Sequence, residues 1–290
     1  MIEARQKDGA FLDDVARTRN DTADPFRVWW LGQSGFLLQY RGKHLLFDPY
    51  LSDSLTRKYA NTDKPHVRMT EQVVDPGCLD FVDVVTSSHA HTDHLDPETL
   101  QRLADANPGL NVVFPESIRE VVRERIGARN VTLIGLDGGD RIEVEGFRLT
   151  AVPAAHNQVE RDGNGRCRFL GYVAEFGNWC VYHSGDTLRH AGLVSALRSF
   201  DIDLAFLPIN GNRPERRVAG NLSGREAATL ARDIGAGAVI PCHFEMFEFN
   251  TESPEEFVAK CRILDQPCVV LRAGESWSPR EKTTNAPLHS

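Results

Sequence analysis

Ser88-His89-Ala90-His91-Thr92-Asp93-His94 is the stretch that decides the fold. It places four potential metal ligands within six positions, directly after residues 83–88, whose apolar start predicts a strand. Imidazole and carboxylate groups are ligands for zinc, manganese and iron. A loop at a strand end can turn His89 and His91 toward one ion, and Asp93 and His94 toward another. The stretch therefore predicts a site for two metal ions.

Three further potential ligands occur later in the chain, and each lies just past an apolar run that predicts a strand. They are His156 after residues 152–155, Asp186 within residues 182–186, and His243 after residues 239–242. Functional groups often lie on the loops that follow strands, where a rigid scaffold positions them. We therefore expect these side chains to complete the site.

The remaining pattern is that of an α/β chain. Expected strands are 26–31, 35–40, 44–47, 83–88, 112–114, 131–134, 141–152, 169–176, 179–183, 202–209 and 238–241. One expected helix begins at Pro97, and the others span 116–126, 188–199 and 223–234. In the last of these, Ser223 and Glu226 have capping-box spacing. The polar segment 48–77 has no clear period and predicts a long loop or lid, a feature that is usually functional.

Two sheets, each covered on one side by helices, would bury both sets of apolar strands. The expected fold is a four-layer αββα sandwich of two mixed sheets flanked by helices. No linker-like composition divides the chain, so we expect a single domain at 26–278. A polar N-terminal extension, 1–25, would precede it, and a C-terminal tail, 279–290, would follow it.

Composition narrows the choice of partners. The 290 residues carry a formal net charge of -8, which argues against a nucleic-acid partner because such proteins usually present a basic face. No apolar run is long enough to span a membrane, and residues 1–25 lack an apolar signal-peptide core. Six scattered cysteines predict reduced thiols. We expect a cytoplasmic protein that acts on a small molecule, and a homo-oligomer is compatible with the sequence.

The order H-x-H-x-D-H, then H, D and H, resembles the metallo-β-lactamase superfamily, and this chain fills every position. The resemblance implies that His89, His91 and His156 hold one divalent ion, that Asp93, His94 and His243 hold the other, and that Asp186 bridges them. It implies zinc or manganese as cofactor, with Asp93, His94 and Asp186 as catalytic residues. The expected nucleophile is a hydroxide between the ions, because a bound metal can lower the pKa of water from 15.7 to roughly 7.

A narrower resemblance rests on residues 28–35, 182–186 and 211–214, the last followed by the helix at Ser223. These stretches are similar to the L-ascorbate-6-phosphate lactonase family from about residue 27 to 250, although 48–77 does not match well. The resemblance implies a phosphorylated sugar-acid lactone as substrate and a cationic pocket for its phosphate. Among the candidates Arg213 is favoured, because it lies in the loop after the expected strand 202–209 and could face the metals, and because guanidinium binds phosphate bidentately. The candidates are Arg57, Lys58, Arg68, Arg213, Arg216 and Arg217.

Three more residues have two interpretations each. Asn212, like Asn210, could bind a sugar-like substrate or form a turn beside glycine. His66 could contact substrate or donate a proton, or lie on the surface. His183 could border the site and support Asp186, or be an ordinary strand histidine.

Other functions remain open on the sequence alone. The same chemistry would serve a phosphodiesterase acting on a phospholipid or a nucleotide. A non-catalytic metal-binding module and a structural zinc site are further alternatives, although structural zinc is usually cysteine-rich. Redox chemistry at iron is the last alternative, but diiron flavoprotein relatives carry Glu where this chain has His91.

Overall fold

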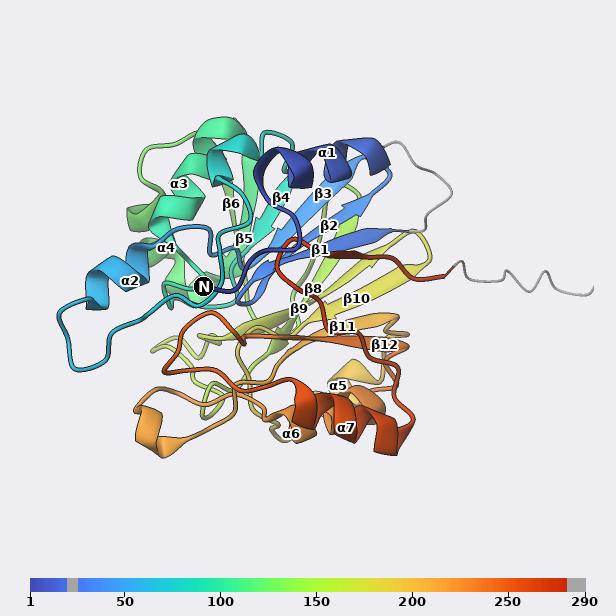
Figure 1. The fold of residues 1–290 in the computed structure, drawn as a ribbon. Coiled ribbons are helices and arrows are strands. Elements are labelled where there is room, and N and C mark those ends of the chain that lie inside the picture. The colour runs from blue at the N-terminus through green and yellow to red at the C-terminus, as the bar shows by residue number, and fades with distance from the viewer. Residues whose placement is uncertain (20–25, 281–290) are drawn as a thin grey trace, which may run out of the picture.

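A computed structural model describes residues 1–19 and 26–280 as two face-to-face sheets with helices on both outer sides (Figure 1). The strand order is β13-β1-β2-β3-β4-β5-β6 in the first sheet and β12-β11-β10-β9-β8-β7 in the second. Each sheet mixes parallel and antiparallel pairs. The predicted four-layer αββα sandwich is confirmed.

The strands and helices have these bounds. The first sheet contains β1 (Arg27–Gly32), β2 (Gly35–Tyr40), β3 (Lys43–Phe47), β4 (Val84–Thr86), β5 (Leu110–Pro115), β6 (Val131–Leu136) and β13 (Ser276–Trp277). The second contains β7 (Arg141–Val144), β8 (Phe147–Pro153), β9 (Leu170–Phe176), β10 (Trp179–His183), β11 (Leu204–Pro208) and β12 (Ala238–Cys242). The helices are α1 (Asp8–Thr18), α2 (Ser54–Tyr59), α3 (Pro97–Ala106), α4 (Arg119–Ile126), α5 (Leu193–Leu197), α6 (Gly224–Asp233) and α7 (Glu255–Leu264), with 3-10 turns η1 (Pro76–Cys78), η2 (Glu116–Ile118) and η3 (Pro214–Arg216).

Side chains alternate between two cores along each strand of the first sheet. In β1, Val28 and Trp30 belong to the core between the sheets, while Trp29 and Leu31 belong to the core under α1, α3 and α4. Successive strand residues point to opposite faces, so a strand buried on both faces must be apolar throughout. This accounts for the unbroken apolar runs, in which Trp29 and Trp30 pack on opposite faces of the first sheet.

Two predicted elements are wrong in their extent. The single strand expected at 141–152 is the hairpin of β7 and β8, which turns at Glu145 and Gly146, both with positive φ. Two residues in that conformation match the twist of a tight hairpin turn. The helix expected at 188–199 is reduced to α5 (Leu193–Leu197), because the chain before it forms the loop that carries Asp186.

Three segments hold more regular structure than expected. The segment 48–77 contains α2 and η1, and it is tied down by the bridges Ile2↔Thr70 and Arg68↔Phe247. The stretch 1–25 contains α1, whose Asp14 accepts a hydrogen bond from Trp29 Nε1 (2.8 Å). The helix α7 was not predicted. The division into 1–25, 26–278 and 279–290 stays a prediction, and 281–290 lie outside the described residues.

Across the described ranges, 1–19 and 26–280, none of the helices combines the length and the apolar character needed to cross a membrane.

The capping box predicted at Ser223 is confirmed. Ser223 Oγ accepts a hydrogen bond from the Glu226 N–H (3.3 Å), and Glu226 Oε2 accepts one from the Ser223 N–H (2.8 Å). Replacing Ser223 with alanine should therefore lower the free energy of unfolding by about 1 kcal/mol, as measured by chemical denaturation. Ser199→Ala is the control, because this exposed serine donates only to the Ala196 carbonyl. Equal losses in both variants would contradict the capping role.

Candidate metal centre

The seven predicted ligands come from loops at the carboxyl ends of four strands. His89, His91, Asp93 and His94 follow β4, His156 follows β8, Asp186 follows β10 and His243 follows β12. Both sheets deliver these loops to one edge of the sandwich. Such edges of α/β sheets are common places for ligand sites.

The structure brings all seven residues together in two adjacent groups. The first group is His89, His91, His156 and Asp186, and the second group is Asp93, His94 and His243. Within each group, one potential ligand atom per residue lies within 4.8 Å of the others. We call the two groups the metal centre.

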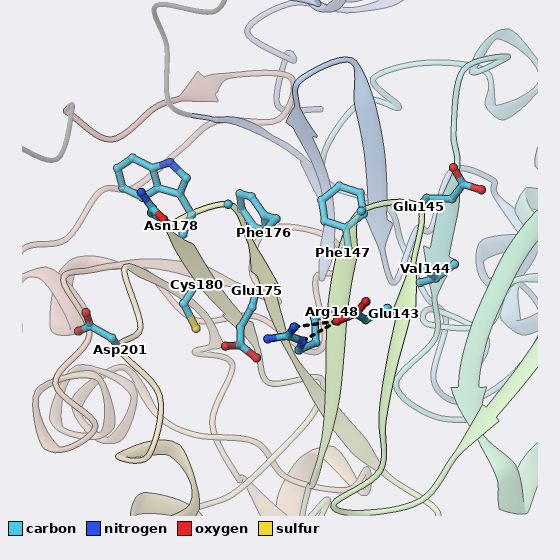
Figure 2. A pocket seen from close by; sticks show the side chains of 13 residues that line it. Glu143, Val144, Glu145, Phe147, Arg148, Glu175, Phe176, Asn178, Cys180 and Asp201 are labelled. Carbon is cyan, nitrogen blue, oxygen red and sulfur yellow. Dashed lines mark hydrogen bonds and ion pairs between the residues drawn. The ribbon is translucent and has the colours of Figure 1, made fainter. Parts of the chain in front are cut away.

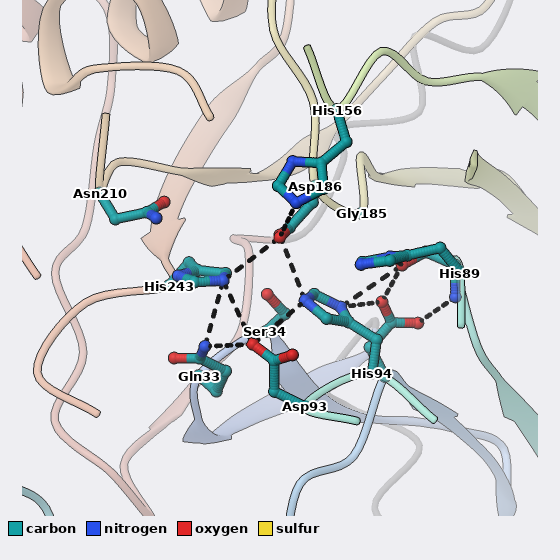
Figure 3. Close-up of polar contacts among 12 residues, drawn as sticks. Gln33, Ser34, His89, Asp93, His94, His156, Gly185, Asp186, Asn210 and His243 are labelled. Atoms are coloured by element: carbon teal, nitrogen blue, oxygen red, sulfur yellow. Dashed lines mark hydrogen bonds and ion pairs between the residues drawn. The ribbon is translucent and has the colours of Figure 1, made fainter. Parts of the chain in front are cut away.

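Asp186 lies between the groups (Figure 3). Its Oδ1 is 3.3 Å from His94 Nε2, and its Oδ2 is 3.4 Å from His243 Nε2 and 3.6 Å from His156 Nε2. The carboxylate therefore faces imidazoles of both groups, as a bridging ligand would.

Three imidazoles of the metal centre are oriented by polar contacts at Nδ1, on the side of the ring that faces away from the metal centre. His94 Nδ1 is 2.7 Å from Asp48 Oδ2, His89 Nδ1 is 2.9 Å from Ser88 Oγ, and His156 Nδ1 is 2.9 Å from the Gly220 carbonyl. A hydrogen bond at one ring nitrogen fixes the tautomer and leaves the other nitrogen available to a metal. Each ring therefore turns Nε2 toward the metal centre.

Several buried polar atoms of the metal centre make no well-oriented hydrogen bond. His89 Nε2, His94 Nε2 and Asp186 Oδ1 are buried, and they make no satisfactory hydrogen bond within the described part of the chain. Buried polar atoms in folded proteins are nearly always paired. Unpaired lone pairs that converge from imidazole and carboxylate groups fit divalent metal ions.

The charges of the site also suit metal binding. Burial alone would raise the pKa of Asp186, but the imidazoles of His243 and His94 hold it well below the usual range. Burial holds the pKa of His89 well below the usual range, which keeps that ring neutral. Burial alone would lower the pKa of His243, but Asp186 and Asp93 raise it to about 9. A metal entering the second group therefore displaces protons.

The turn between β1 and β2 reaches into the second group. Gln33 Nε2 donates to Asp93 Oδ2 (2.7 Å) and lies 3.1 Å from His243 Nε2, while the Gln33 carbonyl accepts from the His243 N–H (2.9 Å). Figure 3 shows this side chain below His243 and beside Asp93. Neither Gln33 nor Asp48 was predicted as a site residue. The only signals were the motif 28–35 and an acidic residue directly after an apolar strand.

His183 supports the loop of Asp186. Its Nε2 donates to the Ser34 carbonyl (2.8 Å), and its Nδ1 accepts from the Gly185 N–H (3.2 Å). Gly185 has φ +57°, and an added Cβ there would lie 2.5 Å from the Ser88 Cβ. His183 does not line the cavity that opens over the metal centre, so the structure places it behind the ligands.

A cavity of about 370 Å³ opens over the metal centre. It is lined by five of the seven ligand residues and by His66, which stacks on Tyr59 with ring centroids 4.2 Å apart. Asn212 and Arg213 do not line it. Arg213 is 54% exposed, and its Nε pairs with Glu252 (2.5 Å). The five ligand residues are His91, Asp93, His156, Asp186 and His243.

Lys58 alone among the six predicted phosphate contacts lines this cavity. Each of the five arginines pairs with a carboxylate instead. Arg125, which was not predicted, also lines the cavity. Of the two cationic groups that line the cavity, Lys58 was among the predicted candidates and Arg125 was not, and the favoured Arg213 lies outside the lining.

A second cavity, of about 530 Å³, lies at the opposite ends of β8 and β10 (Figure 2). It is lined by acidic side chains and by Arg148, which pairs with Glu143 (2.7 Å). None of the seven predicted ligands lines it. The arrangement suited to chemistry is the one at the metal centre.

Comparisons with known proteins agree with this geometry. A model of the beta-lactamase superfamily domain matches residues 43–244. The UPF0173 metal-dependent hydrolase of Methanopyrus kandleri is 30% identical over 87% of this chain and 99% of that protein. Two solved structures share the fold. The metallo hydrolase Igni18 of Ignicoccus hospitalis has a TM-score of 0.65 at 20% identity, over 89% of this chain and 99% of its own. The isothiocyanate hydrolase from Delia radicum gut bacteria has a TM-score of 0.68 at 20% identity, over 87% and 100%.

The family model covers more than half of the chain, and the archaeal relative aligns along nearly all of its own length. The chain therefore belongs to the beta-lactamase superfamily and, within it, to the UPF0173 metal-dependent hydrolases.

Proposed function

We propose that this chain hydrolyses a small ester or lactone with two divalent metal ions, zinc or manganese, held by the metal centre. The observation that carries the proposal is the convergence of unpaired, buried Nε2 and carboxylate atoms beneath an open cavity. Two bound ions would supply an ionised water near neutral pH and would polarise the carbonyl oxygen of the substrate.

The chain's own residues would prepare the site for this reaction. Asp186 joins the two groups, Asp48 and Ser88 fix the imidazoles of His94 and His89, and Gln33 holds the carboxylate of Asp93. Ligands held in place by neighbouring hydrogen bonds need little rearrangement during reaction, which favours catalysis. The same residues would serve either metal, since imidazole and carboxylate suit both zinc and manganese.

The most specific form of the proposal is a phosphorylated sugar-acid lactone such as L-ascorbate 6-phosphate. It is supported by the resemblance of the stretches at 28–35, 182–186 and 211–214, and by a cationic side chain, Lys58, that lines the cavity. The placement of Arg213 outside the cavity lining does not support it.

A substrate panel tests the proposal. Metal-free protein, reconstituted with zinc or with manganese, would be offered lactones, carboxylic esters and phosphodiesters, with a chelated sample as control. We expect metal-dependent turnover of esters and lactones. Turnover of phosphodiesters without turnover of lactones would make the chain a phosphodiesterase. If the protein binds two metal ions but hydrolyses none of these substrates, it is a binding module. Turnover that persists in the chelated sample would refute the metal mechanism.

A further inference from the structure

Two cations beside the metal centre form no ion pair with a carboxylate of the described residues. Lys58 on α2 and Arg125 on α4 both line the cavity, and neither forms an ion pair among the residues that the structure describes. Arg125 is half-buried, and its Nη1 donates to the Leu95 carbonyl (2.8 Å), which anchors one side of the guanidinium. Lys58 Nζ lies 5.1 Å from the centre of the Tyr59 ring.

The setting makes these unpaired charges unusual. The chain has an excess of acidic residues, with 41 Asp and Glu against 33 Lys and Arg. The neighbouring arginines Arg57 and Arg68 are paired with Glu98 and Asp53. A cation that forms no ion pair beside a reaction site is available to a substrate anion, and a guanidinium can bind a carboxylate or a phosphate in a bidentate manner.

Another part of the cavity wall is aromatic. Tyr59, His66, Phe247 and Phe249 line it, and the His66 ring lies 4.2 Å from Tyr59, 4.5 Å from Phe249 and 5.2 Å from Phe247, centroid to centroid. His66 Nδ1 is within 3.1 Å of the Lys64 carbonyl, which holds the ring in this cluster. Such a surface packs favourably against a planar or apolar group.

From these two features we infer that the cavity binds an anionic ester or lactone whose remaining part is a planar or apolar ring. Lys58 and Arg125 bind the anion, and Tyr59, Phe247 and Phe249 pack against the ring. The inference rests on the proposed function for the position of the reacting carbonyl. It goes beyond that function by naming the chemical class of the substrate and the residues that select it. The anion is a carboxylate or a phosphate monoester, since both suit the same cations.

Matched acetate esters test the inference in the metal-loaded protein. The probes are phenyl acetate, 4-acetoxybenzoate and 4-acetoxyphenyl phosphate, with ethyl acetate as the ester without a ring. We expect kcat/KM to favour the two anionic esters over phenyl acetate by roughly tenfold or more, the range of one or two hydrogen bonds to a charged group. The better of the two anionic esters identifies the anion. Phe249→Ala should raise KM for phenyl acetate more than for ethyl acetate.

Two charge-removing variants and one comparison variant locate the anion. Lys58→Met and Arg125→Met should each reduce the preference for anionic over neutral ester by roughly tenfold. Arg213→Met should leave the preference unchanged, because Arg213 lies off the cavity and pairs with Glu252. Equal turnover of anionic and neutral esters by the wild type would overturn the inference while leaving ester hydrolysis intact. A loss of preference confined to Arg213→Met would also overturn it.

A binding measurement separates this inference from the proposed function. Calorimetry with benzoate and phenyl phosphate needs no turnover, so it remains informative if no ester is hydrolysed. We expect both anions to bind roughly tenfold more weakly to Lys58→Met and Arg125→Met than to the wild type or Arg213→Met. Equal affinities in all four proteins would show that the cations do not recognise the anion.

Discussion

Asp186→Asn should lower kcat/KM by more than about 100-fold and should reduce the number of metal ions bound per chain. The carboxylate faces His94 and His243 of the second group and His156 of the first, at 3.3 to 3.6 Å. Asparagine preserves the volume of the side chain but removes its charge and places an N–H donor where a ligand oxygen is needed. Turnover and elemental analysis of the same preparations would measure both effects.

An exposed carboxylate provides the control for this substitution. Asp13→Asn on α1 changes the net charge by the same amount, at an exposed residue that does not line the cavity over the metal centre. It should leave both metal content and turnover unchanged. If Asp186→Asn retains two metal ions and turns over substrate at the wild-type rate, Asp186 does not bridge the groups.

The ligands of the metal centre could be predicted from sequence because metal chemistry restricts residue type. Only a few side chains bind divalent metals, and each ligand here lies directly after an apolar strand. The residues that hold the ligands carry no such local signal. Asp48 is 46 positions from His94, and Gln33 is 60 positions from Asp93. Only the packing of loops from distant strands brings these side chains together.

The lining of the cavity over the metal centre was predicted less well for a related reason. Arg213 and Arg125 carry the same charge, and the sequence does not show which of its cationic side chains form ion pairs with carboxylates. The structure shows that Arg213 pairs with Glu252, whereas Arg125 lines the cavity without such a partner. The wall formed by Tyr59, Phe247 and Phe249 likewise depends on contact between α2 and the segment after β12. Sequence position alone could not place these side chains around one opening.

Asp48→Asn should weaken metal binding by roughly 10- to 100-fold, the cost usual for loss of a residue that orients a ligand. Asp48 is fully buried, its Oδ1 accepts from the Ser88 N–H (2.9 Å), and its Oδ2 faces His94 Nδ1 (2.7 Å). If the asparagine oxygen stays on Ser88, its amide N–H groups meet His94 Nδ1 and drive the imidazole proton to Nε2. If the amide is reversed, its N–H groups oppose the Ser88 N–H instead. Competition with a chromogenic chelator would measure the affinity.

The substitution is well suited to isolate this effect, because it leaves the backbone undisturbed. Asp48 has φ +37°, a conformation that asparagine tolerates as well as aspartate does. Asp83→Asn is the matched control, since Asp83 is a less deeply buried carboxylate that likewise accepts from a main-chain N–H, that of His44 (2.8 Å), away from the metal centre. It should lower stability and leave metal affinity unchanged. Equal metal affinities in the two variants would mean that His94 keeps its orientation without Asp48, and that the ligand geometry is set by the backbone of the loop after β4.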